Sequence, residues 1–215
     1  MAKSGKGSEF ERSFCKKLSL WWTKGQREDI FWRTAGSGAR AKIRGRKGKL
    51  TDGQHGDVAF TDPLGKPLID LLLIELKCGY SKDNIQTLLD LPDRLNPQAW
   101  EQWIRQATDS LSMSKSWYWL IVSKRNGRNE LITMESDFFE ELIDQECFKS
   151  KPNHYLRMTT SVRNDNKQHR KQIEIVCFLL SDWFELIRLK KLKRFANQIS
   201  SLERIQNVSI GKRNK

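Results

Sequence analysis

The chain has 215 residues with 39 Lys and Arg against 26 Asp and Glu, a formal net charge of +13 and an isoelectric point near 9.7. A charge of this sign and size is typical of a protein that binds a polyanion. The cysteines have no CxxC spacing, which argues against a zinc site or a disulfide framework and indicates a reduced setting. With no signal-peptide pattern and no apolar run near the roughly 18 residues of a membrane span, we expect a cytoplasmic protein that has no contact with membranes.

The first predicted element is an amphipathic helix over about residues 8–24. At 100° per residue, Phe14 and Leu18 belong to one apolar stripe. Glu11 falls inside this stripe, whereas Glu9 falls on the opposite side of the helix. A carboxylate within a core-facing stripe needs a partner, so Glu11 is a candidate functional residue and Glu9 is not.

Strands are predicted next at about 30–34, 57–61 and 67–77. Side chains alternate across a strand, so Glu75 and Lys77 share one face of the last of these. Burying either charge unpaired would cost several kcal/mol, so we expect a metal ion, a phosphate or an ion pair there. Taken alone, this Glu-Leu-Lys sequence also fits a solvated strand end.

Asp57 strengthens the interpretation of a functional site. It lies at the start of a short strand, and a turn at 61–66 would let it lie beside Glu75 on an adjacent antiparallel strand. Two neighbouring carboxylates repel each other unless a cation lies between them, and Mg²⁺ or Mn²⁺ is the usual ion for oxygen ligands.

The remaining elements follow from the same periodicities. A helix at 99–111 carries Gln102 and Gln106, which we assign to its solvent-facing side. We predict strands at 117–123 and 130–134, a helix at 137–146, a hairpin of strands 155–162 and 173–180 that extends or flanks the sheet, and a helix from Asp182. Asp182 and Glu185 have capping-box spacing, and that helix runs into a basic cluster at 188–194, interpreted as a solvated face.

Four segments in this order resemble the PD-(D/E)xK nuclease superfamily, and within it the archaeal-type Holliday junction resolvases and their phage relatives. The segments are Lys6–Arg12, Arg33–Gly38, Gly56-Asp57 and Ile74–Lys77, and the likeness covers about residues 5–135.

The resemblance implies a metal-dependent DNA endonuclease. Asp57, Glu75 and the Leu76 carbonyl would hold Mg²⁺ or Mn²⁺, and Glu11 would complete that shell or bind a second ion. Lys77 would orient the attacking water and stabilise the charge on the phosphate. Arg33 and Ser37 would grip a phosphate near the cut.

A basic loop lies between the Arg33–Gly38 segment and Asp57. It has no acidic residue between positions 40 and 49, and its position favours a DNA contact over a merely solvated loop. Its predicted DNA-binding residues are Arg40, Lys42, Arg44, Arg46 and Lys47.

The predicted fold class is α/β: a restriction-endonuclease-like αβββαβ core with a mixed central sheet flanked by helices, plus a C-terminal β-hairpin and helix. Residues 1–135 would form the nuclease core with the loop 39–54 inserted, and 136–215 an extension packed on it with a basic tail. Of the tryptophans, we expect Trp21, Trp100, Trp103, Trp119 and Trp183 to pack in the core. Trp32 fits either core packing or stacking on a DNA base. We interpret His55 as a satisfied or exposed loop histidine.

The resemblance also implies cleavage of branched DNA in recombination or repair, in the host cytoplasm if the protein is phage-encoded. The enzyme would be a homodimer without a small-molecule cofactor, and Phe178, Trp183 and Phe184 are candidates for its interface or for the core. The alternatives are a nuclease acting on duplex or single-stranded DNA in repair, packaging or restriction, and a non-catalytic DNA-binding protein. The second alternative does not explain carboxylates in a basic, DNA-facing cleft.

Overall fold

The computed structural model describes the backbone of residues 6–34, 55–79, 84–90, 98–163 and 170–213, and the side chains of residues 7–34, 55–79, 84–90, 98–162 and 170–202. The predicted DNA-binding residues Ser37, Arg40, Lys42, Arg44, Arg46 and Lys47 lie outside the described residues. None of the described helices is long and apolar enough to cross a membrane.

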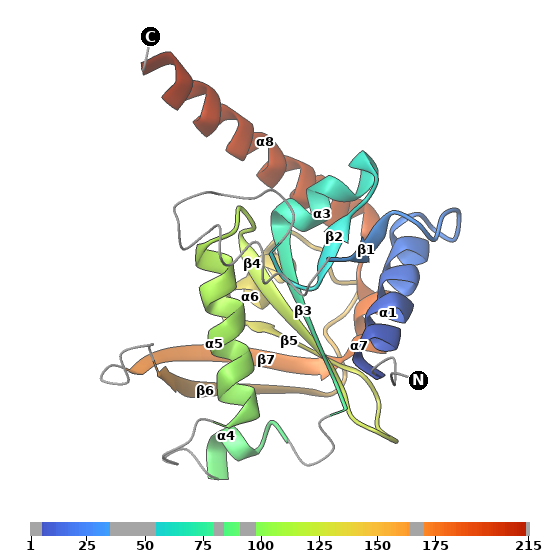
Figure 1. The fold of residues 1–215 in the computed structure, drawn as a ribbon, viewed down its shortest axis with the longest axis vertical. Helices are drawn as coiled ribbons and strands as arrows, with labels where there is room; N and C mark the ends of the chain where they lie inside the picture. The colour runs from blue at the N-terminus through green and yellow to red at the C-terminus, as the bar shows by residue number, and fades with distance from the viewer. Residues whose placement is uncertain (1–5, 35–54, 80–83, 91–97, 164–169, 214–215) are drawn as a thin grey trace, which may run out of the picture.

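A five-stranded mixed sheet forms the centre of the fold (Figure 1). Its order is β3-β4-β5-β7-β6, in which β3 pairs with β4 in parallel and the other neighbours are antiparallel. The strands are β3 (Leu72–Cys78), β4 (Tyr118–Lys124), β5 (Leu131–Glu135), β6 (Tyr155–Arg163) and β7 (Arg170–Leu179). The α/β class and the mixed central sheet are thus confirmed. The hairpin β6–β7 extends the sheet rather than flanking it.

Two short strands, β1 (Phe31–Arg33) and β2 (Val58–Phe60), form a separate antiparallel pair. The expectation that the Asp57 strand would form a ladder with the Glu75 strand is therefore wrong among the described residues. Contact with β3 is made instead by the residue before β2, through the hydrogen bond from Asp57 N to Ile74 O at 2.8 Å.

Helices cover both faces of the central sheet (Figure 1). One face packs against α5, and the other against α1, α6 and α7, with α3 and α8 at its edge. The helical segments are α1 (Lys6–Trp22), η1 (Pro63–Gly65), α3 (Lys66–Leu71), α4 (Thr87–Asp90), α5 (Ala99–Ser112), α6 (Ser136–Asp144), α7 (Leu180–Leu186) and α8 (Leu189–Arg213).

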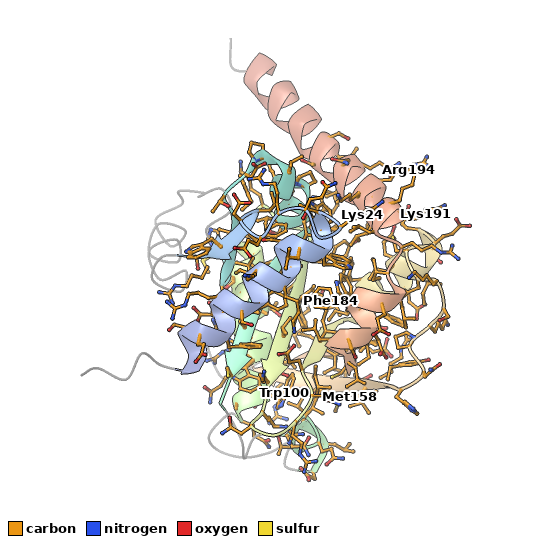
Figure 2. All side chains as sticks on the ribbon, turned by 90° about the vertical axis from the view of Figure 1, so that its right-hand side faces the viewer. Lys24, Trp100, Met158, Phe184, Lys191 and Arg194 are labelled. Carbon is orange, nitrogen blue, oxygen red and sulfur yellow. The ribbon has the colours of Figure 1, made fainter. Side chains whose placement is uncertain are left out.

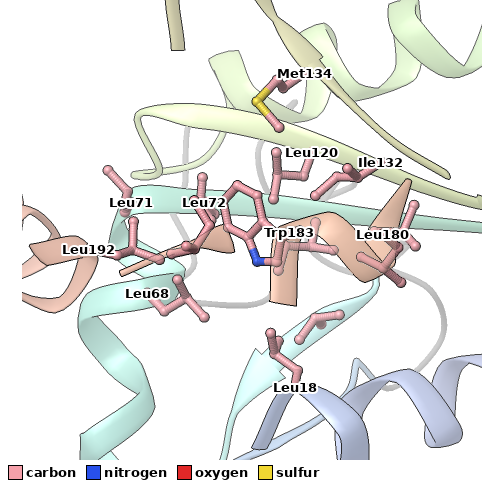
Figure 3. Close-up of a cluster of buried hydrophobic side chains, with 14 of the residues drawn as sticks. Leu18, Leu68, Leu71, Leu72, Leu120, Ile132, Met134, Leu180, Trp183 and Leu192 are labelled. Carbon is pink, nitrogen blue, oxygen red and sulfur yellow. The ribbon is translucent and has the colours of Figure 1, made fainter. Parts of the chain in front are cut away.

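The alternation of β3 divides its side chains between two buried clusters. Leu72, Ile74 and Leu76 face the α1 side, where Leu18, Leu120 and Trp183 also pack (Figure 3). Leu73 faces the other side and packs with the α5 cluster, which contains Trp103 and Ile104. Glu75 and Lys77 have the parity of Leu73, so the chain directs them towards α5.

The segment 67–71, predicted as the start of a strand, is helical. Asp62 begins the helical stretch by accepting a hydrogen bond from Leu64 N, and Pro67 occupies the first turn of α3, where its missing N–H costs nothing. Leu68, Ile69 and Leu71 are buried. A short, continuous apolar run does not by itself distinguish a buried strand from a buried helix.

The single helix predicted from Asp182 is instead two helices. α7 already begins at Leu180 with no side-chain cap, so the capping-box prediction is wrong, and the chain is extended at Ile187. Hydrogen bonds with the segment around Phe148 interrupt the helix, because Lys149 N donates to Leu186 O and Arg188 N donates to Cys147 O.

Candidate active site

Glu75 and Lys77 form a buried ion pair on β3. The Lys77 Nζ atom lies 2.9 Å from Glu75 Oε2, and the two side chains are 10% and 1% exposed. The solvated strand end is therefore excluded, and an ion pair is one of the three partners that the sequence predicts.

Gln106 on α5 bridges both members of this pair. Its Nε2 atom donates to Glu75 Oε2 at 2.8 Å, and its Oε1 atom accepts from Lys77 Nζ at 3.2 Å. The assignment of Gln106 to a solvent-facing surface is therefore wrong, whereas Gln102 is exposed as expected. The sequence does contain a sign that Gln106 faces the protein: it lies next to Ala107 and three residues after Trp103, at the border of the buried stripe of α5.

Asp57 lies against β3 through two hydrogen bonds. Its backbone N–H binds Ile74 O, and its Oδ2 atom accepts from Leu76 N at 2.8 Å. This approach depends on Gly56, which has φ +77° and whose added Cβ would lie 2.7 Å from Ile74 O. A glycine is needed here because of both the left-handed backbone and the close contact.

The surroundings of Asp57 disfavour its negative charge. Burial, followed by the neighbouring Glu75, raises the pKa of Asp57 to about 6, and Glu11 acts in the same direction. The hydrogen bond from Leu76 N and the charge of Lys77 oppose this rise in pKa only in part. Two carboxylates are thus held close together in a buried setting.

Glu11 reaches the same region from α1. Its Oε2 atom lies 3.2 Å from Arg33 Nη1 on β1, and its side chain is 18% exposed, whereas Glu9 is exposed. Cys15, one turn along α1, is buried, and its pKa rises to about 12 through burial and then the charges of Glu11 and Asp57. The structure therefore gathers Glu11, Arg33, Asp57, Glu75 and Lys77 into one region.

A family comparison agrees with this arrangement. The model of the family described as "Phage putative PDDEXK endonuclease" matches residues 2–194, most of the chain. The chain belongs to this phage PD-(D/E)xK endonuclease family. No curated protein and no solved structure matches it significantly. The resemblance to the superfamily is confirmed, and the match identifies a nuclease without specifying the form of its DNA substrate.

The oxygen donors of this PD-(D/E)xK endonuclease fit a divalent cation. Among the described side chains, no three His, Cys, Asp or Glu residues are close enough together to hold a metal. Mg²⁺, however, is commonly held by one or two carboxylates and keeps several of its waters. Asp57 and Glu75 supply two carboxylates. Burial and then the charge of Glu75 raise the pKa of Asp57, and a bound cation would offset both.

Burial decides between the alternatives for the tryptophans and for His55 of the endonuclease. Trp21 packs partly buried against the core, and Trp100, Trp103, Trp119 and Trp183 are buried, as predicted. Trp32, next to Arg33, is 51% exposed and remains available to a ligand. His55 is buried, which excludes the exposed alternative.

Proposed function

We propose that the protein is a divalent-metal-dependent endodeoxyribonuclease that cuts phosphodiester bonds in branched DNA. The observation that carries the catalytic part is the cluster of buried Glu75 with the partly buried Lys77 and Gln106, beside Asp57. A protein that only binds DNA has no reason to bury two mutually repelling carboxylates, because they also repel phosphate.

Asp57, Glu75 and the Leu76 carbonyl are the proposed ligands of Mg²⁺ or Mn²⁺, and Glu11 is the proposed additional ligand. When bound, such an ion polarises the scissile phosphate and lowers the pKa of a bound water. Leu76 suits this role because its N–H already points to the Asp57 side of β3, and the N–H and C=O of one strand residue point to the same edge.

Lys77 is the proposed electrostatic catalyst. Its ammonium is held by Glu75 and Gln106, so it is oriented before substrate arrives and loses little freedom during the reaction. Lys77 would stabilise the negative charge that grows on the phosphate and orient the attacking water. Gln106 would act as a positioning residue for both Glu75 and Lys77.

Arg33 and Ser37 are proposed to bind a phosphate next to the cut. The Arg33 side chain is 36% exposed while one of its nitrogens contacts Glu11, so part of the guanidinium remains accessible to DNA. For Ser37 and the basic loop residues Arg40, Lys42, Arg44, Arg46 and Lys47, DNA binding stays a prediction from sequence.

The preference for branched DNA and the homodimer are supported by the resolvase-like order of motifs. Symmetric cutting of a four-way junction needs two active sites related by a two-fold axis. Phe178 and Trp183 are buried in the core, and Phe184 packs against it, so these three residues belong to the core and not to the proposed interface.

A cleavage gel with four-way junction, flap, duplex and single-stranded DNA tests the proposal. In Mg²⁺ or Mn²⁺, but not in EDTA, the wild-type protein should cut the junction in preference to the other three substrates, and Glu75→Gln should not cut. Equal cutting of linear duplex and junction, together with a monomer in light scattering with and without DNA, would leave a general nuclease. Metal-independent binding without any cutting would leave a non-catalytic DNA-binding protein.

A further inference from the structure

A second basic site lies at the far end of α1 from the candidate active site. A cavity of about 460 Å³ is bounded by the end of α1, by η1 and α3, and by α8. Its polar lining includes Lys24, Gln26, Lys193 and Asn197, and none of the described residues lining it is acidic. An anion entering this cavity would therefore meet ammonium and amide groups without carboxylate repulsion.

The two lysines of this cavity are close to each other. Lys193 Nζ lies 4.8 Å from the centre of the Trp22 ring, and its pKa is lowered by burial and then by the charge of Lys24. Among the described residues, no ion pair neutralises either lysine. The acidic residues Glu11, Glu28 and Glu130, which pair with α1 residues or lie on α1, form ion pairs with other cations. The aromatic ring compensates one ammonium only in part.

The walls of the cavity are held together by specific contacts. Trp22 Nε1 donates to Leu64 O at 2.8 Å and so ties α1 to η1. Asp70 on α3 accepts hydrogen bonds from Lys66 and from Ser200 on α8, which fixes α8 against α3. Lys24 and Lys193 are therefore brought together by the fold and are not two independent surface lysines.

The first turns of α8 extend the same positive surface. Arg188, Lys190, Lys191, Lys193 and Arg194 follow one another, the first turn contains no acidic residue, and within the described part of the chain only Lys191 has an ion pair, with Glu146. Cations at a helix N-terminus are disfavoured both by the helix dipole and by one another. Figure 2 shows Lys24, Lys191 and Arg194 at this end of the molecule, where α8 passes the end of α1.

We propose that this cavity and the adjoining α8 surface bind backbone phosphates of the DNA substrate away from the cut. The inference rests on the proposed function and adds a second DNA contact to it. Glu11 and Lys24 are 13 positions apart, which corresponds to roughly 20 Å at the helical rise. Because the DNA axis rises by about 3.4 Å per base pair, DNA must extend about six base pairs from the cut to reach both sites.

The test uses variants that remove charge and retain packing. Lys193→Met keeps the aliphatic stem over Trp22, and Lys24→Gln keeps a long side chain at a residue with φ +55°. The matched control is Lys151→Gln with Lys171→Met, because these exposed lysines do not line the cavity and the net charge change is the same. Lys190→Gln with Arg194→Gln is a second test variant that removes only exposed cations.

Binding is measured by fluorescence anisotropy in EDTA with a 30-base-pair duplex and with a hairpin whose stem has about three base pairs, which at about 3.4 Å of rise per base pair is too short to span both sites. Two lost phosphate contacts should flatten the salt slope on the long duplex by about 2, so the loss of affinity should be roughly 10-fold larger at 50 mM than at 200 mM salt. The hairpin should be bound equally by wild type and variants. An unchanged slope for both test variants, or an equal loss on the hairpin and with the control, would overturn the inference.

Cleavage separates this inference from the proposed function. In Mg²⁺ and at saturating DNA, the test variants should cut the preferred substrate at the wild-type rate, since no altered residue belongs to the candidate active site. If wild type cuts DNA and the test variants bind like wild type, only the second site is wrong. If wild type binds through Lys24 and Lys193 but never cuts, the second site stands and the nuclease proposal is wrong.

Discussion

Lys77 and Lys193 are both lysines at partly buried positions, but their surroundings differ. The ammonium of Lys77 donates hydrogen bonds to the carboxylate of Glu75 and to the amide of Gln106, and these two bonds fix its position. Lys193 lies over an aromatic ring near another lysine, with no carboxylate lining its cavity. The first arrangement suits a group that must meet one phosphate in one geometry, and the second suits retention of a polyanion by charge.

The largest effect is expected at Glu75 and Lys77. Glu75→Gln and Lys77→Ala should each lower the cleavage rate by about 100- to 1000-fold, because each removes a preorganised charge from the reacting site. DNA affinity in EDTA should change little, in contrast to the Lys24 and Lys193 variants. Single-turnover cleavage and anisotropy measure the two quantities, and a large loss of affinity for Lys77→Ala would erase the distinction between the two lysines.

Gln106 should have the next largest effect, because it acts through Glu75 and Lys77. Gln106→Ala should lower the cleavage rate by about 10- to 100-fold, as is typical for residues that orient ligands, and should leave DNA affinity unchanged. Gln102→Ala on the same helix is the matched control and should cut like wild type. Added Mg²⁺ should be needed at a higher concentration for Gln106→Ala, a change that loss of stability alone would not produce.

Glu11 and Glu9 form a matched pair on α1. Glu11→Gln should reduce cleavage by at least about 10-fold, since Glu11 lies among the active-site charges, whereas exposed Glu9→Gln should have no measurable effect. A cleavage time course for the two variants is sufficient. An inactive Glu9→Gln beside an active Glu11→Gln would mean that the helix faces the DNA with its other side.

Local periodicity predicts the parts of this site that lie within one element. The 3.6-residue period of α1 distinguishes Glu11 from Glu9, and the alternation of β3 puts Glu75 and Lys77 on one face. Neither periodicity predicts which elements pack against each other or how closely. Gln106 meets Lys77 only because α5 packs across β3, so its polar character alone favours solvent.

Tertiary contacts also override local signals elsewhere. The approach of Asp57 to β3 depends on the left-handed Gly56, and the break between α7 and α8 depends on hydrogen bonds to the segment around Phe148. Without that break, a continuous helix would carry the basic cluster in another direction. A solvated helix face is therefore a reasonable interpretation of 188–194 from sequence, and the cavity with Lys24 becomes visible only in the fold.

The last prediction concerns the stability of the metal-free protein, not its cleavage rate. The pKa of Asp57 is about 6 in the folded chain against an ordinary value of 3.8, so between these pH values the folded state binds more protons than the unfolded state. Stability should therefore fall as pH rises from about 4 to 6 and then stay level. Asp57→Asn lacks this penalty and should be more stable than wild type at pH 7.5 in EDTA, by up to about 3 kcal/mol.

Thermal unfolding in EDTA at pH 4.5 and 7.5 measures this difference, with the exposed Asp144→Asn as control. The advantage of Asp57→Asn should shrink at pH 4.5, where Asp57 is already largely protonated in the folded wild type. Added Mg²⁺ should raise the melting temperature of wild type more than that of Asp57→Asn, because a ligand that binds only the folded state stabilises it. A wild-type protein that is more stable than Asp57→Asn at pH 7.5 in EDTA would show that the carboxylates of Asp57 and Glu75 are compensated without a cation. In that case the difference between the candidate active site and the cavity at Lys193 would rest on the contacts of Lys77 alone.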